Sequence, residues 1–319
     1  MAKKITVRDL LNNTHLKMVT GEEYLDRTIT TADISRPGLE MTGYFNYYAP
    51  ERVQLMGITE TAFAARMTHD ELMVVARKMM QPVTPTFVVS TGRKLPEEFM
   101  AVAKETHIPI LSTELTSSRI LSNMSFYLDG QLAKRQSVHG VLVDVFGLGV
   151  LITGDSGVGK SETALELIQN GHRLIADDRV DVYAQDEERL VGEPPAILRN
   201  LMEIRGVGII DVVNLFGTGA VRSHATISFN LHLAKWSDDQ KIDRLGNGED
   251  TIRIQGVDLP RFVLPVQAGR NLAALIETAA KNFRAKMMGY DATKTFDDNL
   301  NRLIAENSKA EHEQATNQD

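Results

Sequence analysis

The 319-residue sequence contains no cysteine, which excludes disulfide bonds and thiolate metal sites. Long apolar runs are also missing. The most apolar window, residues 141–152, is too short to span a bilayer and contains Asp144. The first residues, Met1-Ala2-Lys3-Lys4, are followed by a mixed polar segment rather than the apolar stretch of a signal peptide. These absences predict a soluble, cytoplasmic protein that does not insert into a membrane.

Positive charge is in deficit, since 35 Lys and Arg residues face 42 Asp and Glu residues, giving a net charge of −7. Proteins that bind nucleic acid normally present a basic surface, so this balance argues against that class. A basic partner protein remains compatible with it. The hydrophobic content of 43% and charged content of 24% are ordinary for a globular protein, and the length predicts two domains.

What the chain does contain is a stretch that fits G-x-x-x-x-G-K-[ST], the phosphate-binding P-loop, at every fixed position. Residues 149–153 run into it as a short apolar strand, and residues 161–170 leave it as a helix that Gly171 is expected to end in a left-handed conformation. Backbone N–H groups of such a loop converge on phosphate oxygens at the positive end of the helix. The nucleotide-binding residues predicted in this way are Gly154, Asp155, Ser156, Gly157, Val158, Gly159, Lys160 and Ser161.

Phosphoryl transfer also needs cations and a carboxylate beside the nucleotide. We expect Lys160 to reach the β- and γ-phosphates and the Ser161 hydroxyl to join the shell of a Mg²⁺ ion. Asp177 and Asp178 end a short apolar run, and adjacent strand residues point to opposite faces, so one acid can face the phosphates while the other braces the loop. Asp178 is the favoured general base toward a hydroxyl. The alternative is a solvated acidic turn.

Three weaker candidates have structural explanations that compete with a functional one. Glu203 could complete the Mg²⁺ shell and Arg205 could hold a phosphate, although an exposed strand end with a glycine-rich turn would account for both. His139 is a lone histidine, and lone histidines are more often structural than catalytic.

Two further candidates lie nearer the C-terminus. Arg244 could supply a cation in the transition state or could be an ordinary surface arginine. The segment 265–271 could form a second anion-binding loop, because Gly269 permits close backbone approach and Arg270 suits phosphate. Otherwise it is a simple loop before the next helix.

The pattern predicts an N-terminal α/β domain over residues 1–132. Strands are expected at 53–56, 86–89 and 108–111, helices at 70–80 and 96–105, and a turn-rich loop at 33–39. No catalytic signature lies in this part, so a scaffolding, oligomerisation or regulatory role is expected. A helix over 118–135 is expected to link the halves.

The predicted second domain, residues 133–306, carries the P-loop. It opens with a strand, a turn and a second strand, which differs from the alternating βαβ order of a doubly wound sheet. A late helix is expected over 272–287. Residues 307–319 are polar, have no apolar face and are expected to be disordered.

Taken together, these motifs resemble the bifunctional HPr kinase/phosphorylase family over essentially the whole chain. The segments that carry the resemblance are the P-loop, residues 176–180, residues 265–271 and the N-terminal residues 33–38. The most specific is a signature block made of Met202, Glu203, Ile204, Arg205, Gly206, Val207, Gly208, Ile209, Ile210 and Asp211.

The resemblance implies an ATP-dependent, possibly also pyrophosphate-dependent, kinase for a serine of the phosphocarrier protein HPr. The same site would remove that phosphate by phosphorolysis, with inorganic phosphate attacking and pyrophosphate leaving. Such an enzyme regulates carbon catabolite repression and sugar uptake. The resemblance also implies a catalytic domain with a P-loop fold similar to that of phosphoenolpyruvate carboxykinase, a homo-hexamer, and fructose 1,6-bisphosphate as activator.

By the same resemblance, His139, Lys160, Asp178 and Arg244 match the family's active-site set. Ser161 and Glu203 match residues that hold Mg²⁺ or Mn²⁺. The family's dephosphorylating loop matches Pro265, Val266, Gln267, Ala268, Gly269 and Arg270. Many relatives carry a basic residue and often proline where this chain has Gln267-Ala268, which departs from the phosphate-binding pattern.

Other functions are compatible with a P-loop. A kinase for a small metabolite, or a carboxykinase-like enzyme, would differ from a protein kinase in its acceptor. A non-catalytic, nucleotide-gated switch would bind nucleotide without transferring phosphate. A GTPase is disfavoured because the chain has no N-K-x-D motif, and no long acidic strand typical of an ATPase motor is identified.

Overall fold

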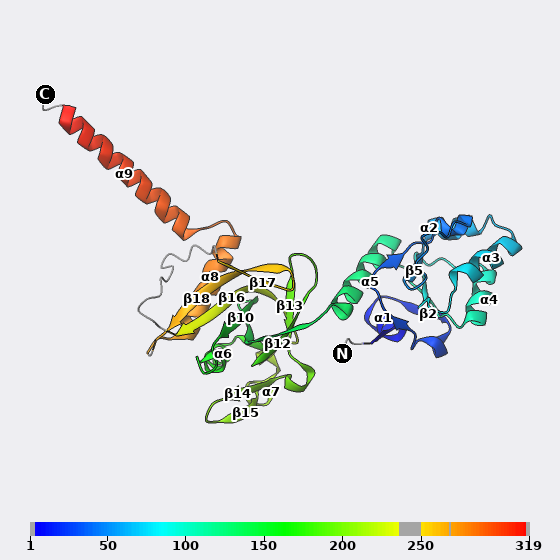
Figure 1. Ribbon diagram of the computed structural model, residues 1–319, viewed down its shortest axis with the longest axis horizontal. Coiled ribbons are helices and arrows are strands. Elements are labelled where there is room, and N and C mark those ends of the chain that lie inside the picture. Colours follow the sequence, from blue (N-terminus) through cyan, green and yellow to red (C-terminus); the bar gives the residue numbers. More distant parts are fainter. Residues whose placement is uncertain (1–3, 236–249, 268, 317–319) are drawn as a thin grey trace. The chain divides into compact units, whose positions relative to one another are not determined.

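The computed structural model describes residues 4–235, 250–267 and 269–316, and it divides into two compact units, Met1–Lys134 and Arg135–Asp319 (Figure 1). Both units mix sheet and helix, which confirms the predicted α/β class with two domains. In the described ranges, no helix is both long enough and apolar enough to cross a membrane.

The N-terminal unit is built on a five-stranded sheet. Its strands, in spatial order, are β2 (Lys17–Thr20), β7 (Ile110–Ser112), β6 (Phe87–Val89), β5 (Val53–Met56) and β4 (Ile34–Ser35). Strands β4 to β7 run parallel and β2 is antiparallel to β7. Two further strands, β1 (Ile5–Thr6) and β3 (Thr28–Ile29), pair separately. Every residue of β6 is buried and apolar, as expected for a parallel strand covered on both faces.

Helices cover the two faces of this sheet through separate apolar clusters. One cluster joins Phe87 and Val89 to α2 (Ile58–Ala64), α3 (His69–Met79) and α4 (Glu97–Thr106). The other joins Val88 and Leu111 to α1 (Val7–Asn13) and α5 (Ser117–Leu132). The predicted strands and helices of this half are present, although β7 begins only after Pro109, which has no N–H to donate.

Helix α5 corrects the expectation that residues 118–135 simply link the two halves. Ile120, Met124 and Leu128 are spaced along one helix face and are completely buried in the N-terminal core. The helix is therefore an integral layer of the N-terminal unit, and it ends at Leu132.

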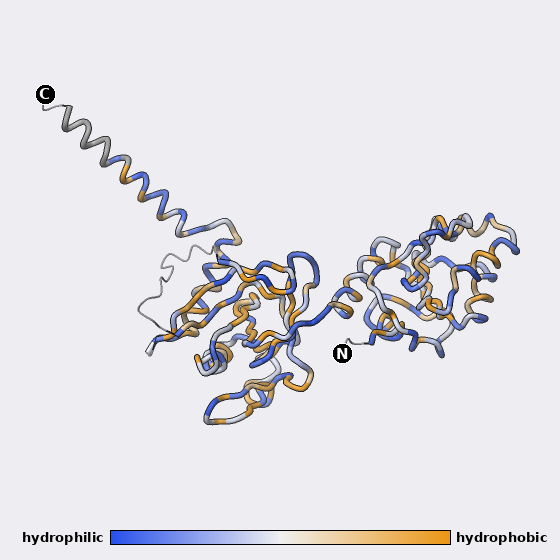
Figure 2. Tube along the Cα trace, in the orientation of Figure 1, coloured by the Kyte–Doolittle hydropathy of each residue, from blue (hydrophilic) through white to orange (hydrophobic). Residues whose placement is uncertain are grey.

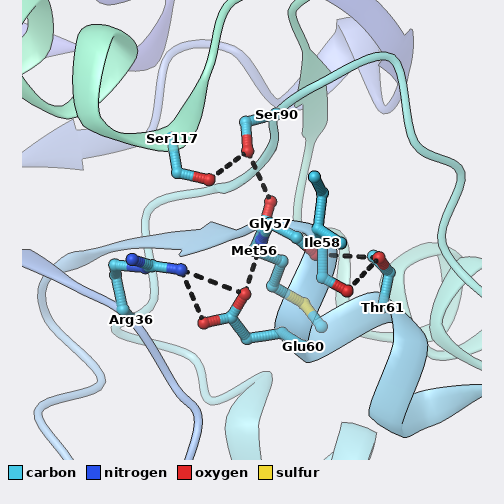
Figure 3. Close-up of polar contacts among 8 residues, drawn as sticks. All are labelled: Arg36, Met56, Gly57, Ile58, Glu60, Thr61, Ser90 and Ser117. Atoms are coloured by element: carbon cyan, nitrogen blue, oxygen red, sulfur yellow. Dashed lines mark hydrogen bonds and ion pairs between the residues drawn. The ribbon is translucent and has the colours of Figure 1, made fainter.

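A buried carboxylate fixes the start of α2 in this unit (Figure 3). Glu60 is 4% exposed and accepts a hydrogen bond of 2.8 Å from the Gly57 N–H, the first residue after β5. Its other oxygen lies 3.0 Å from the guanidinium of Arg36, just after β4. Ser90, just after β6, donates to the Met56 carbonyl and contacts the Ser117 hydroxyl at 2.7 Å. Residues that follow three parallel strands are thus tied together at one edge of the sheet.

The C-terminal unit contains a nine-stranded sheet. Along its main path the strands are β11 (Arg173–Ala176), β9 (Val141–Val145), β10 (Leu148–Gly154), β16 (Ala225–Lys235), β13 (Leu190–Glu193), β12 (Arg179–Ala184) and β8 (Gln136–His139). β18 (Val257–Val266) pairs with β16 in parallel and with β17 (Thr251–Ile254) antiparallel. β9 and β10 form the predicted antiparallel pair, and β10 then runs parallel to β16.

Two apolar layers enclose this sheet. On one face α6 (Lys160–Gln169) and α8 (Leu272–Met287) pack against β10 and β16. On the other face the strands β12 and β13 fold over, and their side chains join Leu142 and Leu151 in a second core. The hairpin of β14 (Leu201–Ile204) and β15 (Gly208–Asp211) leads into α7 (Val212–Phe216). In Figure 2 the strands at the centre of the nine-stranded sheet are largely orange, the colour of hydrophobic residues.

Helix α9 (Ala292–Thr316) corrects a second expectation, because it continues through residues 307–316, which were predicted to be disordered. The segment is rich in alanine, glutamate, lysine and glutamine, all strong helix formers. Intrinsic propensity therefore extends the helix beyond its last apolar residues. The absence of an apolar face did not exclude a helix here.

Candidate active site

The P-loop lies between β10 and α6, as predicted from the motif. Gly159 takes a left-handed conformation (φ 98°) and forms the N-cap of α6, which ends before the left-handed Gly171 (φ 93°). Gly154 is needed for a different reason, because a Cβ there would collide with the Leu233 carbonyl of neighbouring β16. The loop therefore packs closely against β16 at Gly154 and leads directly into α6 at Gly159. A loop in this position before a helix N-terminus is suited to binding a phosphate through its N–H groups.

Lys160 is held inside this loop, with only 7% of its surface exposed. Its ammonium donates to the carbonyl oxygens of Gly154 and Asp155, both at 3.0 Å. An ammonium has three protons, so two are directed at the loop and one is free for another acceptor. The two carbonyl oxygens therefore hold the Lys160 ammonium inside the P-loop.

Asp177 lies at the centre of the site and is 3% exposed. One carboxylate oxygen accepts from the Ser161 hydroxyl at 2.8 Å, and the other accepts from the Glu203 N–H at 3.0 Å. Burial raises the pKa of Asp177, while these hydrogen bonds act in the opposite direction. The carboxylate joins the helix after the P-loop to the β14–β15 hairpin.

Asp178 points elsewhere because the chain turns sharply at this residue. β11 ends at Ala176 and β12 begins at Arg179, and Asp178 between them adopts φ 62°, a left-handed conformation that aspartate tolerates better than most residues. Its side chain is 65% exposed. The two adjacent acids do separate, as predicted, but a turn separates them rather than the alternation of one strand.

His139, at the end of β8, lies against this turn. Its Nδ1 is 2.9 Å from the Asp178 carbonyl oxygen and 3.3 Å from the Asp178 Oδ1. A carbonyl oxygen only accepts, so Nδ1 carries the hydrogen in the shorter contact. The Gly140 N–H donates to the same carbonyl at 3.1 Å. The histidine therefore helps to hold the strained residue that presents the Asp178 carboxylate.

The β14–β15 hairpin brings the signature block to the P-loop. Met202 and Ile204 are buried in the core, whereas Glu203 between them is exposed on the opposite side. The Arg205 guanidinium lies against the Gly157 backbone, 3.1 Å from the position of a Cβ built on that glycine. The block thus has two faces, one packing the hairpin onto the domain and one facing the phosphate cradle.

These side chains line one cavity of about 150 Å³. The lining residues are His139, Ser156, Gly157, Gly159, Lys160, Ser161, Glu162, Asp177, Asp178, Glu203 and Arg205. They come from four separate segments of the chain. Three of the four predicted catalytic residues, His139, Lys160 and Asp178, therefore lie at one place with the two predicted metal-binding residues, Ser161 and Glu203.

Other predicted residues are placed differently. Arg244 and Ala268 lie outside the described residues. In the loop after β18, Gly269 is left-handed, and Asn271 caps α8 and donates to Glu166 on α6 at 2.8 Å. The loop is tied to α6, but its described residues do not line the cavity at the P-loop. Asp211 accepts from the Asn214 N–H as the N-cap of α7, which is a structural role.

Sequence reasoning did not select three polar residues behind the P-loop. The Thr153 hydroxyl lies 3.2 Å from His232 Nδ1, and the buried Asn230 donates to Thr153 at 3.0 Å. Burial and the neighbouring Arg261 and Lys160 charges lower the pKa of His232. These residues carry no motif, and only the pairing of β10 with β16 reveals that they lie together.

The donors around the P-loop are oxygen atoms, the ligands that Mg²⁺ prefers. They comprise the Ser161 hydroxyl and the carboxylates of Asp177, Asp178 and Glu203. Over the described ranges, no three histidine or acidic side chains are arranged closely enough to form a complete metal-binding cluster. The Ser161 hydroxyl and these carboxylates are the residues that could contribute oxygen ligands to a metal ion here.

Comparison with known proteins covers nearly the whole chain. Residues 5–128 match the family described as HPr Serine kinase N terminus, and residues 130–300 match the HPr Serine kinase C-terminal domain. The HPr kinase/phosphorylase of Lactiplantibacillus plantarum is 63% identical over 309 residues, covering 97% of this chain and 98% of that protein. The HPr kinase/phosphorylase of Levilactobacillus brevis is 63% identical over 308 residues, covering 97% and 99%.

A solved structure is also similar. The Hpr(Ser) kinase/phosphatase from Coxiella burnetii is 36% identical, and the match covers 48% of this chain and 99% of that chain with a TM-score of 0.45.

Proposed function

The chain belongs to the HPr kinase/phosphorylase family, and on this premise we propose that it transfers the γ-phosphoryl group of ATP to a serine of HPr and reverses the reaction by phosphorolysis. The observation that supports this most directly is the single cavity in which the P-loop, Asp178 and the signature residue Glu203 meet. A phosphate cradle beside an exposed carboxylate is what phosphoryl transfer to a hydroxyl requires.

In the kinase direction, the serine oxygen attacks the γ-phosphorus and the bond to the bridging β-oxygen breaks, releasing ADP. Asp178 accepts the serine proton, because its carboxylate is exposed at the mouth of the cavity. Lys160 and the loop N–H groups stabilise the negative charge on the phosphates. His139 orients the turn that carries Asp178.

In the reverse direction, an oxygen of inorganic phosphate attacks the phosphorus of phosphoserine. The bond from phosphorus to the serine oxygen breaks, protonated Asp178 gives its proton to that oxygen, and pyrophosphate forms. The same carboxylate serves both reactions, because in each the bond between phosphorus and the serine oxygen is made or broken with a proton transfer at that oxygen. We assign to the segment 265–270, by family resemblance, a supporting role in dephosphorylation, and to Arg244 a role in the active-site set.

Mg²⁺, or Mn²⁺ in its place, is the metal that this donor set suits. Ser161 and Glu203 would hold it, with Asp177 orienting both through its two hydrogen bonds. When bound, such an ion neutralises charge on the β- and γ-phosphates. The raised pKa of Asp177 is consistent with a buried carboxylate whose charge a cation would stabilise.

Family membership also supports proposals about assembly and context. We propose a homo-hexamer, activation of the kinase by fructose 1,6-bisphosphate, and a cytoplasmic location where ATP and HPr are available. HPr is the protein substrate, and the net charge of −7 suits a basic docking face on it.

The test is to give the purified protein serine-phosphorylated HPr and inorganic phosphate, and to measure pyrophosphate and dephosphorylated HPr. Equal amounts of the two products are expected. Release of inorganic phosphate alone would indicate a hydrolytic phosphatase and contradict the mechanism. Phosphorylation of a metabolite but not of HPr would favour a metabolite kinase, and nucleotide binding without turnover would favour a switch.

A further inference from the structure

A second cavity lies in the N-terminal unit, far along the sequence from the P-loop. It has a volume of about 320 Å³ and is bordered by Val89 and Gly92 at the end of β6 and by Ile110 and Ser112 of β7. Val89 and Ser112 are the last residues of these two parallel strands, at the carboxyl edge of the sheet, whereas Ile110 is the first residue of β7. Open α/β sheets bind their ligands at this edge, because the loops there are free to vary while the strands hold them in place.

The floor of the cavity is apolar. It is formed by Val89, Leu95, Met100 and Ile110, and the exposed Val19 also lines the cavity. Val89 and Ile110 belong to the buried core under α3 and α4, and Leu95 and Met100 pack against that core. Ser90, the residue after Val89, turns to the other face of the sheet toward Ser117 (Figure 3). The floor is therefore a continuation of the folded core.

The mouth of the cavity is charged. Arg93 and Lys94 are exposed neighbours, and Glu114 faces them from the segment after β7. Within the described part of the chain, neither cationic side chain has a recorded ion pair or hydrogen-bond acceptor. An apolar floor below two unpaired cations is suited to a molecule that has both an anionic and an apolar end.

The backbone at the mouth is held in an uncommon conformation. Thr91 and Gly92 are both left-handed, with φ of 61° and 62°. Their N–H groups donate to the carbonyl oxygens of Leu115 at 2.9 Å and Thr113 at 3.0 Å. A Cβ at Gly92 would collide with the Glu114 carboxylate. A left-handed threonine is strained, and such strain is characteristic of sites that hold a ligand.

We propose that this cavity binds a small organic anion with an apolar body. The oxyanion, a carboxylate or a phosphate ester, lies between Arg93 and Lys94, and the apolar part contacts Met100 and Ile110. Glu114 accepts a hydroxyl or N–H of the same molecule. The volume corresponds to about ten non-hydrogen atoms, if each takes about the 30 Å³ of a water molecule.

The test uses the full-length protein labelled with ¹³C at its methionine methyl groups, and the Met100 signal is assigned with Met100→Leu. Three probes of similar shape are titrated: 3-phenylpropionate, phenyl phosphate and the neutral 3-phenylpropanamide. At least one of the two anions should shift the Met100 methyl signal with saturation, and the amide should bind about tenfold more weakly or not at all. The anion that binds more tightly identifies the oxyanion class.

Substitutions then locate the binding. Arg93→Gln and Lys94→Gln should each weaken binding about tenfold, whereas the matched Lys104→Gln, an exposed lysine on α4 that does not line the cavity, should not change it. Ser112→Leu should fill the cavity and abolish the Met100 shift while the melting temperature stays near that of the parent protein.

Several results would overturn the proposal. These are a Met100 signal that no anion moves, equal binding of the amide, or equal weakening by Lys104→Gln. Phenyl phosphate that binds only at the P-loop also leaves Met100 unmoved and counts against the cavity. Because the readout lies in the N-terminal unit, these failures do not bear on the proposed kinase function, and a failed kinase assay does not bear on them.

Discussion

Each unit of this protein buries a carboxylate at the edge of its sheet, but the two carboxylates have different partners. Glu60 in the N-terminal unit caps the Gly57 N–H and is paired with Arg36 at 3.0 Å. Asp177 in the C-terminal unit accepts from Ser161 and from the Glu203 N–H, and no described cation pairs with it. One buried charge is compensated within the fold, and the other is not.

This difference separates structural from functional use of the same chemical group. A buried charge is costly unless it is paired, so a compensated carboxylate such as Glu60 can be explained by stability alone. An uncompensated one such as Asp177 is explained by a cation that arrives with the substrate. Burial raises the pKa of Asp177, with the neighbouring Asp178 charge adding to it, while the hydrogen bonds from Ser161 and Glu203 act in the opposite direction. The following variants test whether this contrast holds.

Lys160→Met, a change at the P-loop of the C-terminal unit, is expected to have the largest effect on activity. The change removes the ammonium that lies among the P-loop carbonyls but keeps a side chain of similar length. We expect the initial rate of HPr phosphorylation to fall by about 10³-fold, because the ammonium stabilises charge on the transferring phosphate. Retention of more than about a tenth of the activity, with nucleotide still bound, would contradict this role.

The second-largest effect is expected from Asp178→Asn, which tests whether Asp178, and not the adjacent Asp177, is the general base. Asp178→Asn preserves a side chain that tolerates the left-handed backbone at φ 62°, so it removes the base without displacing the turn. Kinase and phosphorylase rates should both fall by about 10²-fold or more. They are measured with HPr and with serine-phosphorylated HPr. Loss in one direction only would show that different groups serve the two reactions.

A moderate effect on stability is expected in the N-terminal unit. Arg36→Gln leaves Glu60 buried without its cation and should reduce the free energy of unfolding by about 1–2 kcal/mol, since Arg36 itself is 43% exposed and partly screened. The matched control is Arg52→Gln, whose partner Asp33 is 64% exposed, with an expected loss of about 0.5 kcal/mol or less. Urea unfolding measures both. Equal losses would remove the distinction between a buried and an exposed pair.

The smallest effect concerns pH. Because burial raises the native pKa of Asp177, the native state keeps a proton that the unfolded state releases between the ordinary value near 3.9 and the raised one. Stability from this group is therefore present at low pH and is lost as pH rises through that window, by at most about 1.4 kcal/mol per pH unit. Asp177→Asn should remove this component, which urea unfolding measures as the pH rises from about 4, the ordinary value of an aspartate. An unchanged pH dependence would mean that the carboxylate is not destabilised by burial.

The sequence predicts well wherever local rules decide the structure. Gly159, Lys160 and Gly171 place the start and end of α6, and the apolar period of residues 272–287 gives α8 with the same bounds. The signature block also predicts a site residue at Glu203, although it does not say what Glu203 contacts.

The features that the sequence does not predict depend on contacts between residues that are distant along the chain. The sequence predicts that one of the two adjacent acids braces the loop, but only the structure shows that Asp177 does so through the Glu203 N–H, because the two segments share no motif. Glu60 is an ordinary acidic residue in the sequence, yet the packing of α2 buries it against Arg36. The turn at Asp178 was read as part of a strand because its neighbours on both sides are strand-forming. The intrinsic propensities of the residues determine where helices and strands form, and tertiary packing determines which of their polar side chains come into contact.

The two carbonyl contacts of Lys160 bear on anion selectivity. Main-chain oxygens accept from two of the three ammonium protons, so an incoming anion finds one free proton and must displace a carbonyl to gain a second. Chloride or bicarbonate, with a single negative charge and weak basicity, gains little from that exchange. A polyphosphate carries several charges and engages the loop N–H groups at the same time, so it displaces the carbonyls readily. The geometry of the loop therefore favours a polyphosphate over a singly charged anion.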